Sequence, residues 1–97
     1  MIKHTVCFKL KDNSAENCEK AKEVLLSMEG KVPQIKSIEA GVDFLHSERS
    51  YDVILQVVVE DEQALADYQK DPYHCSVVKP HMHAVRETSV AVDCVIG

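Results

Sequence analysis

The sequence lacks a long apolar run, a dense basic run and any Cys-x-x-Cys pair. No stretch approaches the roughly 20 apolar residues that an α-helix needs to span a bilayer. The start, Met1-Ile2-Lys3-His4, leads into an alternating pattern and not into the continuous apolar core of a signal peptide. We therefore expect a cytoplasmic protein that does not use a membrane as a partner.

Basic residues are also in the minority. The chain has 11 Lys and Arg against 16 Asp and Glu, which gives a net charge of −5. An acidic excess of this size repels nucleic acid and anionic membrane surfaces at long range. We expect neither of them as a partner.

The chain has four cysteines, Cys7, Cys18, Cys75 and Cys94, and their spacing does not resemble that of a metal site. Disulfides are rare in a cytosolic protein, where thiols stay reduced. We expect four free thiols that behave as small hydrophobic side chains.

Ninety-seven residues without a linker, an internal repeat or a low-complexity segment predict one domain over residues 1–97. A chain this short buries a small share of its surface, so a monomer is often only marginally stable. Oligomerisation is a common remedy.

Alternation of apolar and polar residues predicts four strands, over residues 2–11, 35–44, 51–60 and 85–96. The third of these is apolar on both faces at Val57-Val58-Val59, which is typical of a central strand covered on both sides.

Helical spacing of apolar residues predicts a helix over residues 13–28, with Asn13 as its N-cap and a glutamate three residues later. A second helix follows the third strand and is broken by Pro72. One further short helix precedes the last strand, and we expect Pro80 to end it.

The resulting order, β-α-β-β-α-β with an extra helical turn, is that of the ferredoxin-like α+β fold. Its helices cover one face of a four-stranded antiparallel sheet. The other face then needs a cover, and a second copy of the chain is the economical choice. We predict a homodimer through the sheet face, a dimeric α+β barrel.

Two places combine polar side chains of catalytic type with apolar surroundings. Residues 67–74 bring Tyr68, Pro72 and His74 into one corner between two helices. His4 is the polar member of the otherwise apolar face of the first strand. A small-molecule site is expected between that corner and that strand.

The pair in His81-Met82-His83 could bind a metal if it lay on a strand, but the sequence offers no third ligand. Pro80 is expected to place the pair in a connection. We favour a solvated loop and predict no metal.

Together these segments resemble one family, the stress-responsive dimeric α/β-barrel (Dabb) proteins. The resemblance runs over nearly the full chain, and its segments are Ile2-Lys3-His4-Thr5-Val6-Cys7-Phe8-Lys9-Leu10, Val32-Pro33-Gln34-Ile35 leading to Gly41, Ser50-Tyr51-Asp52, and Ala64-Leu65-Ala66-Asp67-Tyr68-Gln69-Lys70-Asp71-Pro72-Tyr73-His74. It implies a homodimeric barrel of two ferredoxin-like units.

The chain is similar in site residues to the plant polyketide cyclases of this family, which close a linear polyketide by aldol condensation without metal or cofactor. The resemblance implies that His4, Tyr68 and His74 would be the catalytic groups. The family often has a histidine immediately before the proline, whereas this chain has Asp71.

An aldol closure needs a base beside a carbonyl and a donor for the oxyanion. Burial and a helix N-terminus both favour neutral imidazole, which suits His74 as the base. Tyr68 would orient it or donate to the substrate, and His4 would be a second donor. A purely structural interpretation stays open: a core His4 bonded to a backbone carbonyl, a Tyr68 that anchors its helix and a His74 that caps a helix.

Three functions therefore remain: a protein that holds a small apolar or keto-aromatic ligand, a cofactor-free cyclase or oxygenase, and a structural stress-associated oligomer whose pocket is filled. No cofactor is expected in any of them. The apolar side chains expected to line the pocket are Val6, Phe8, Val57, Val59, Leu65 and Val77.

Overall fold

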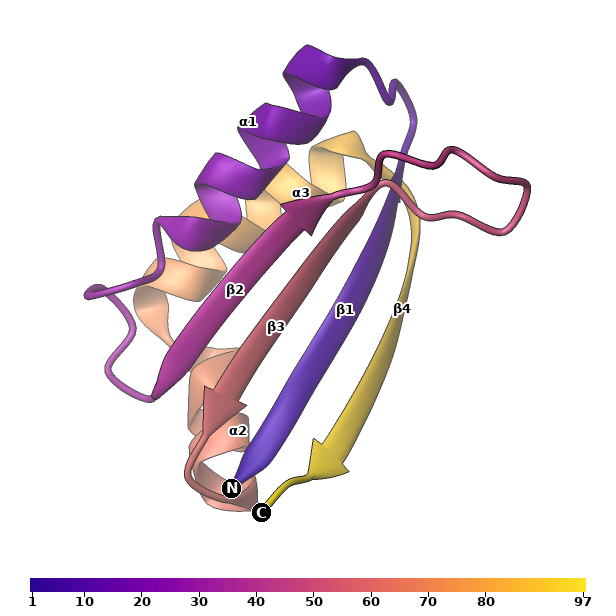
Figure 1. Cartoon of the computed structure of the whole chain (residues 1–97). Helices are drawn as coiled ribbons and strands as arrows, with labels where there is room; N and C mark the ends of the chain where they lie inside the picture. The colour runs from indigo at the N-terminus through magenta and orange to yellow at the C-terminus, as the bar shows by residue number, and fades with distance from the viewer.

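The computed structural model describes residues 1–97 as a four-stranded sheet with helices on one side (Figure 1). The elements in chain order are β1 (Ile2–Leu10), α1 (Ala15–Leu26), β2 (Ser37–Val42), β3 (Val53–Val59), α2 (Glu62–Lys70), η1 (His74–Val78), α3 (Lys79–Val85) and β4 (Arg86–Val95). The predicted ferredoxin-like order and the four antiparallel strands are confirmed.

The sheet has the order β2-β3-β1-β4, and every neighbouring pair is antiparallel. The first strand is therefore central, between β3 and β4. On β1, His4 pairs with Val57 on one side and with Asp93 on the other. This register brings a histidine and a carboxylate to the same face of the sheet, because directly paired residues share a face.

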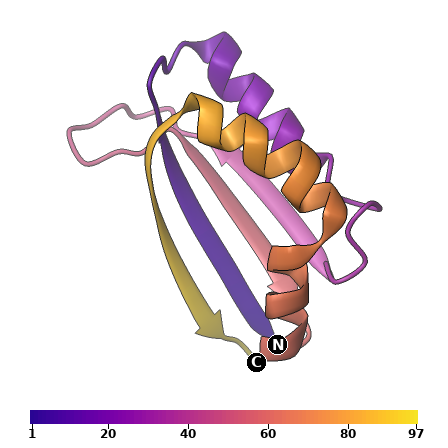
Figure 2. The same cartoon turned by 180° about the vertical axis from the view of Figure 1, so that it is seen from behind.

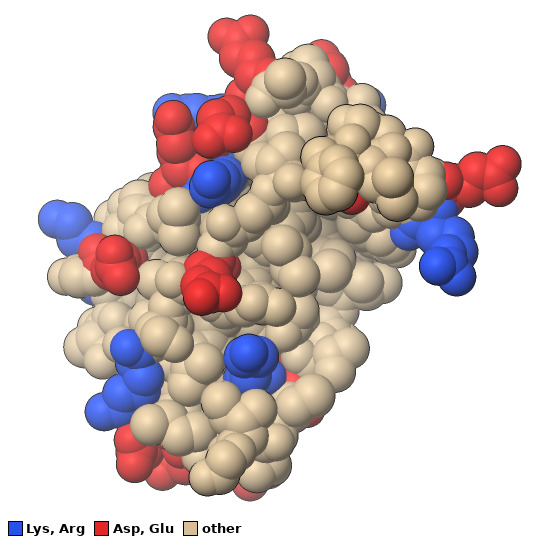
Figure 3. Space-filling model, viewed as in Figure 1, with Lys and Arg blue, Asp and Glu red and all other residues tan.

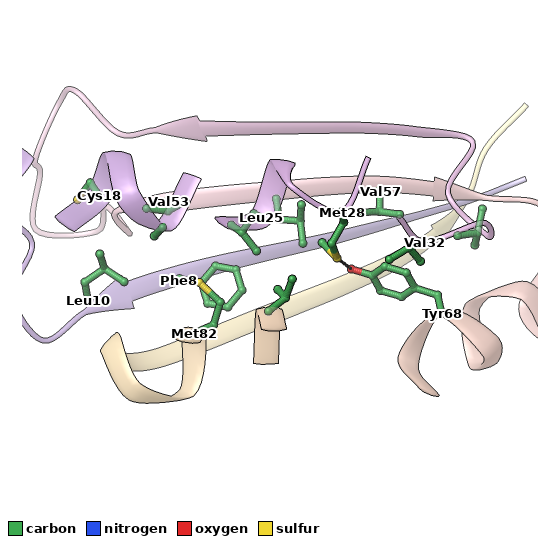
Figure 4. Packing of buried hydrophobic residues seen from close by; sticks show 14 of the residues in the cluster. Phe8, Leu10, Cys18, Leu25, Met28, Val32, Val53, Val57, Tyr68 and Met82 are labelled. Atoms are coloured by element: carbon green, nitrogen blue, oxygen red, sulfur yellow. Dashed lines mark hydrogen bonds between the residues drawn. The ribbon is translucent and has the colours of Figure 1, made fainter. Parts of the chain in front are cut away.

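The helices lie over one face, and β4 runs along the edge beyond the area that they cover (Figure 2). Between helices and sheet lies a core of aliphatic, sulfur-containing and aromatic side chains. Phe8 on β1, Leu25 on α1 and Met82 on α3 meet there, and Tyr68 on α2 points toward Met28 (Figure 4).

The first helix begins one residue later than predicted. Its N-cap is Ser14, whose hydroxyl accepts the N–H of Asn17. Asn13 was the predicted cap, and this was wrong because its amide donates instead to the buried carboxylate of Asp52 at 3.2 Å. That carboxylate also accepts the N–H of Leu10, which ties the end of β1 to the start of β3.

The segment after Pro72 forms two consecutive helical elements, and the prediction that Pro80 ends the short helix was wrong. The five residues of η1 form a wide π-type turn, in which Lys79 N–H donates to the His74 carbonyl. Pro80 then lies in the first turn of α3, where a missing N–H costs little. His81 and His83 consequently lie on a helix and not in a connection, and residues two apart on a helix do not face each other.

The second face of the sheet is open. Val57 and Val59 are completely buried against the helices, but Val58 on the opposite face is only half-buried. Figure 3 shows this face as a largely uncharged surface with charged side chains scattered over it. The apolar pattern of β3 predicts that this face is covered as well, and no element of the same chain covers it. No helix combines the length and the apolar content needed to cross a membrane.

Candidate ligand site

A cavity of about 220 Å³ lies between the sheet and the helices, beside β4. Its walls come from every helical element and from three strands. The residues that line it are His4, Val6, Phe8, Leu25, Leu55, Tyr68, Gln69, His74, Val78, Lys79, Met82, His83, Arg86 and Ser89. The three polar residues proposed from the sequence, His4, Tyr68 and His74, are thus brought together at one site.

His74 is positioned by the end of α2. Asp71 is buried, and its carboxylate accepts the N–H groups of Tyr73 at 2.9 Å and of His74 at 3.2 Å. These bonds satisfy amide groups that a helical start leaves without partners. Asp71, at the position before Pro72, therefore fixes the backbone of His74.

The imidazole of His74 has a defined tautomer. Nδ1 lies 3.0 Å from the backbone carbonyl of Tyr68. A carbonyl only accepts, so Nδ1 carries the proton and the neutral ring has its lone pair on Nε2. Burial lowers the pKa of His74 below the ordinary value, and the nearby positive charge of Lys79 acts in the same direction. Neutral His74 is the form of a general base.

The Nε2 atom of His74 bonds no group of the chain and is reachable by solvent. Gln34 Oε1 is the one completely buried side-chain nitrogen or oxygen that lacks a hydrogen-bond partner. The unbonded Nε2 atoms of His4 and His74 are therefore not sealed off, although both residues are more than nine-tenths buried. Since both residues line the cavity, these atoms are available to a ligand there.

His4 is held by a carboxylate on the neighbouring strand. Its Nδ1 lies 2.5 Å from Oδ1 of Asp93, so Nδ1–H donates and Nε2 is left free. The structural interpretation of His4 expected a backbone carbonyl as its partner. A carboxylate instead orients the ring and keeps the proton of the neutral imidazole on Nδ1.

Tyr68 supplies an aromatic surface beside both imidazoles. Its ring stacks on that of His74 with centroids 4.5 Å apart and meets that of His4 edge-on at 5.6 Å. Its hydroxyl points into the core, where it donates to the sulfur of Met28 at 3.8 Å, and burial raises its pKa. The ring of Tyr68 thus faces the site, while the hydroxyl forms a hydrogen bond with neither histidine.

The six apolar residues expected to line the pocket separate into three pairs. Val6 and Phe8 line the cavity. Val57 and Val59 lie in the closed core. The remaining two, Leu65 and Val77, are not in the cavity wall: Leu65 packs against the outside of the core and Val77 is 41% exposed. Val78 occupies the place expected for Val77, because the wide turn of η1 shifts the helical phase.

Sequence reasoning missed Asp93. It is the one charged residue between Thr88 and Gly97, and it shares an alternating set with Ala91 and Val95. A single acidic residue on an otherwise uncharged stretch of a strand could have indicated a functional position. Its pairing with His4 still required the register of β1 and β4, which the sequence does not supply.

Solved structures with the same fold come from several bacteria and plants. A dimeric ferredoxin-like protein of unknown function from Thermobifida fusca is 21% identical, with a TM-score of 0.83 over 98% of this chain and 90% of that one. A hydroxynitrile lyase from Passiflora edulis is 13% identical, with a TM-score of 0.81 over 99% and 93%. A Dabb family protein from Mesorhizobium loti is 22% identical, with a TM-score of 0.75 over 98% and 95%.

Identities this low establish a shared fold and no more. No curated protein sequence matches the chain at a significant level. The family comparison is decisive, because the model of the stress responsive A/B barrel domain matches residues 2–96. The chain therefore belongs to the stress responsive A/B barrel (Dabb) domain family.

Proposed function

We propose that this protein is a homodimer that holds a small apolar or keto-aromatic ligand in the cavity between sheet and helices. The observation that carries the proposal is the cavity itself, with the free Nε2 atoms of His4 and His74 in a wall of which 7 of the 14 residues are hydrophobic. Ligand sites commonly combine an apolar lining with a few convergent polar groups. A pocket filled by side chains, as a purely structural oligomer would have, lacks this free space.

The size of the cavity limits the ligand. Its volume of about 220 Å³ lies below the roughly 300–1,000 Å³ typical of sites for drug-sized molecules. One ring with short substituents matches this space. The ring of Tyr68 and the side chain of Phe8 provide apolar contact area for such a molecule.

The dimer is inferred from the open face of the sheet. Ile54, Val90 and Val92 project from that face with 36%, 48% and 59% of their surface exposed. Contiguous exposed apolar area is typical of an interaction surface. The edge strands β2 and β4 also offer unpaired backbone groups, which a second copy would cover. Several solved structures of this fold are described as dimeric.

Titration with a small aromatic methyl ketone such as acetophenone, followed by methyl NMR, tests the ligand proposal. We expect the signals of Val6 and Val78 to shift, while Val92 on the opposite face stays unchanged. A Val6→Phe variant fills the cavity and should abolish the shift of Val78 while the chain remains folded. Absence of any shift at Val6 and Val78, for this ketone and for a set of related aromatic ligands, would contradict the proposal.

A second candidate function, a cofactor-free proton-transfer enzyme, is favoured by the state of the two histidines. Neutral His74 has its lone pair on a reachable Nε2, and His4 is backed by Asp93. His74 Nε2 would take the proton from the carbon next to a carbonyl, and His4 would donate to the oxygen once its Nε2 also carries a proton. In an aldol closure, the resulting enolate carbon bonds to a second carbonyl carbon. The oxygen of that carbonyl then takes the proton that His74 Nε2 removed, which restores neutral His74.

Exchange of the methyl protons of acetophenone for deuterium in D₂O measures the first of these steps without a known substrate. Wild type should accelerate the exchange, and a well-placed base contributes about 10²–10⁴-fold. A His74→Ala variant that still binds the ketone but loses the exchange supports catalysis. Exchange at the wild-type rate in that variant would remove His74 from the mechanism and leave ligand binding as the function.

A further inference from the structure

We propose that the ligand of this cavity carries a carboxylate, held at the mouth by Lys79 and Arg86. The inference rests on the proposed ligand-binding function and specifies the chemical class of the ligand. It comes from the charge of the cavity wall, which differs from the charge of the whole chain.

The wall contains no acidic residue. Of its 14 residues, Lys79 and Arg86 are cationic and three are histidines, whereas none is Asp or Glu. The whole chain has 16 Asp and Glu and a net charge of −5. A hollow whose charged groups are all positive attracts anions and disfavours cations.

The two cations have no anionic partner in the chain. The four ion pairs of the structure involve His4, Lys22, Lys36 and His46. Lys79 Nζ donates to the Gln69 carbonyl at 2.9 Å, and Arg86 donates to the Ser89 hydroxyl at 3.4 Å. An ammonium has three donors and a guanidinium has five, so both retain unused N–H groups.

Three carboxylates that bond to a wall residue or adjoin Arg86 in the chain are already engaged or directed elsewhere. Asp93 accepts from His4, and Asp71 accepts two backbone N–H groups. Glu87 follows Arg86 at an irregularity of β4, where the register with β1 shifts, and it lines a different, polar hollow together with Lys9 and Lys11. None of them therefore neutralises the two cations from within the wall.

Partial burial strengthens the attraction. Lys79 and Arg86 are both half-buried, and a charge shielded from water is screened less than one on an open surface. The rest of the wall is apolar at Val6, Phe8 and Val78, which suits a ring. An aromatic or short aliphatic acid satisfies both parts, with its carboxylate at the mouth.

The test compares benzoate with benzamide, its neutral analogue of nearly equal shape, by calorimetric or NMR titration. Wild type should bind benzoate at least about tenfold more tightly, and the preference should decrease with added salt. Lys79→Met and Arg86→Met should each weaken benzoate about tenfold while leaving benzamide within about twofold. Lys20→Met, on the exposed side of α1, is the matched control and should change neither affinity.

Unchanged benzamide binding in the variants shows that the cavity is intact, so loss of folding cannot imitate the result. Equal affinities for benzoate and benzamide, insensitive to both substitutions, would overturn the carboxylate proposal and leave the ligand proposal standing. Binding of neither probe would overturn both. Competition by inorganic phosphate as strong as that by benzoate would show an ion site without an apolar part, which would also overturn the inference.

Discussion

Replacing Asp71 with alanine would remove the acceptor of two backbone N–H groups at the start of η1, those of Tyr73 and His74. Loss of a helix cap costs about 0.5–2 kcal/mol. Because Asp71 is buried, with 7% of its surface exposed, water replaces the lost oxygen poorly, and an orphaned buried donor costs about 1–3 kcal/mol. We expect Asp71→Ala to lower the free energy of unfolding by about 2 kcal/mol, at the upper end of the range for a helix cap.

Thermal unfolding at a fixed protein concentration measures this loss. For a domain of about this size, 1 kcal/mol corresponds to roughly 4–8 °C, so the midpoint should fall by about 10 °C. Asp67→Ala is the control, because Asp67 is exposed and accepts one side-chain bond from Gln63. It should change the midpoint by less than about 2 °C. Equal effects of the two substitutions would refute the capping role of Asp71.

Asp71→Asn separates the capping hydrogen bonds of Asp71 from the effect of its charge on His74. The amide keeps an oxygen for the two N–H groups, so most of the stability should return. The Asp71 carboxylate raises the pKa of His74 and partly opposes the effect of burial, so its removal should lower that pKa further. Titration of the His74 ring by NMR measures this shift, and an upward shift would contradict the assigned electrostatics.

Three further predictions concern His74, Tyr68 and the open sheet face. Burial keeps the His74 pKa below 6.5, so near that pH the unfolded chain binds more protons than the folded chain. The free energy of unfolding should therefore fall as the pH drops below about 6.5. Urea unfolding between about pH 7.5 and pH 5 measures this dependence, and His74→Asn should make it weaker. Tyr68→Phe loses only the long hydrogen bond to Met28 and should lower the free energy of unfolding in urea by less than about 1 kcal/mol. Tyr68→Ala opens a cavity in the core and should lower it by about 3–5 kcal/mol. Equal losses would contradict the position assigned to the hydroxyl. Val92→Lys places a charge on the proposed dimer face and should weaken the dimer at least about tenfold in sedimentation, and an unchanged dimer would exclude that face as the interface.

The order of the elements was predictable because the two periods of the apolar pattern are clear. Residues Ile2 to Leu10 alternate, and Ile2, His4, Phe8 and Leu10 on one face of β1 are buried, as the alternation predicts. The choice between Ser14 and Asn13 as cap was not decidable, since both residue types cap helices well. It depended on Asp52, a residue far along the chain that binds the asparagine.

The cavity was less predictable than the fold. Helical spacing at 3.6 residues per turn cannot anticipate the π-type turn of η1, which brings Val78 and not Val77 to the wall. Pro80 was misinterpreted for a related reason: the sequence does not reveal that a new helical element begins at Lys79. The pairing of His4 with Asp93 depended on a strand register between residues 89 positions apart.

The central feature of the site is a pair of histidines whose Nε2 atoms are free at one ligand cavity. A long-range ¹H–¹⁵N NMR spectrum of the histidine rings, recorded with and without an aromatic ligand that binds, tests this most directly. We expect that His4 and His74 both carry their proton on Nδ1 and that the Nε2 signals of both respond to the ligand. A proton on Nε2 of the free His74, or a bound ligand that leaves both rings unaffected, would contradict it.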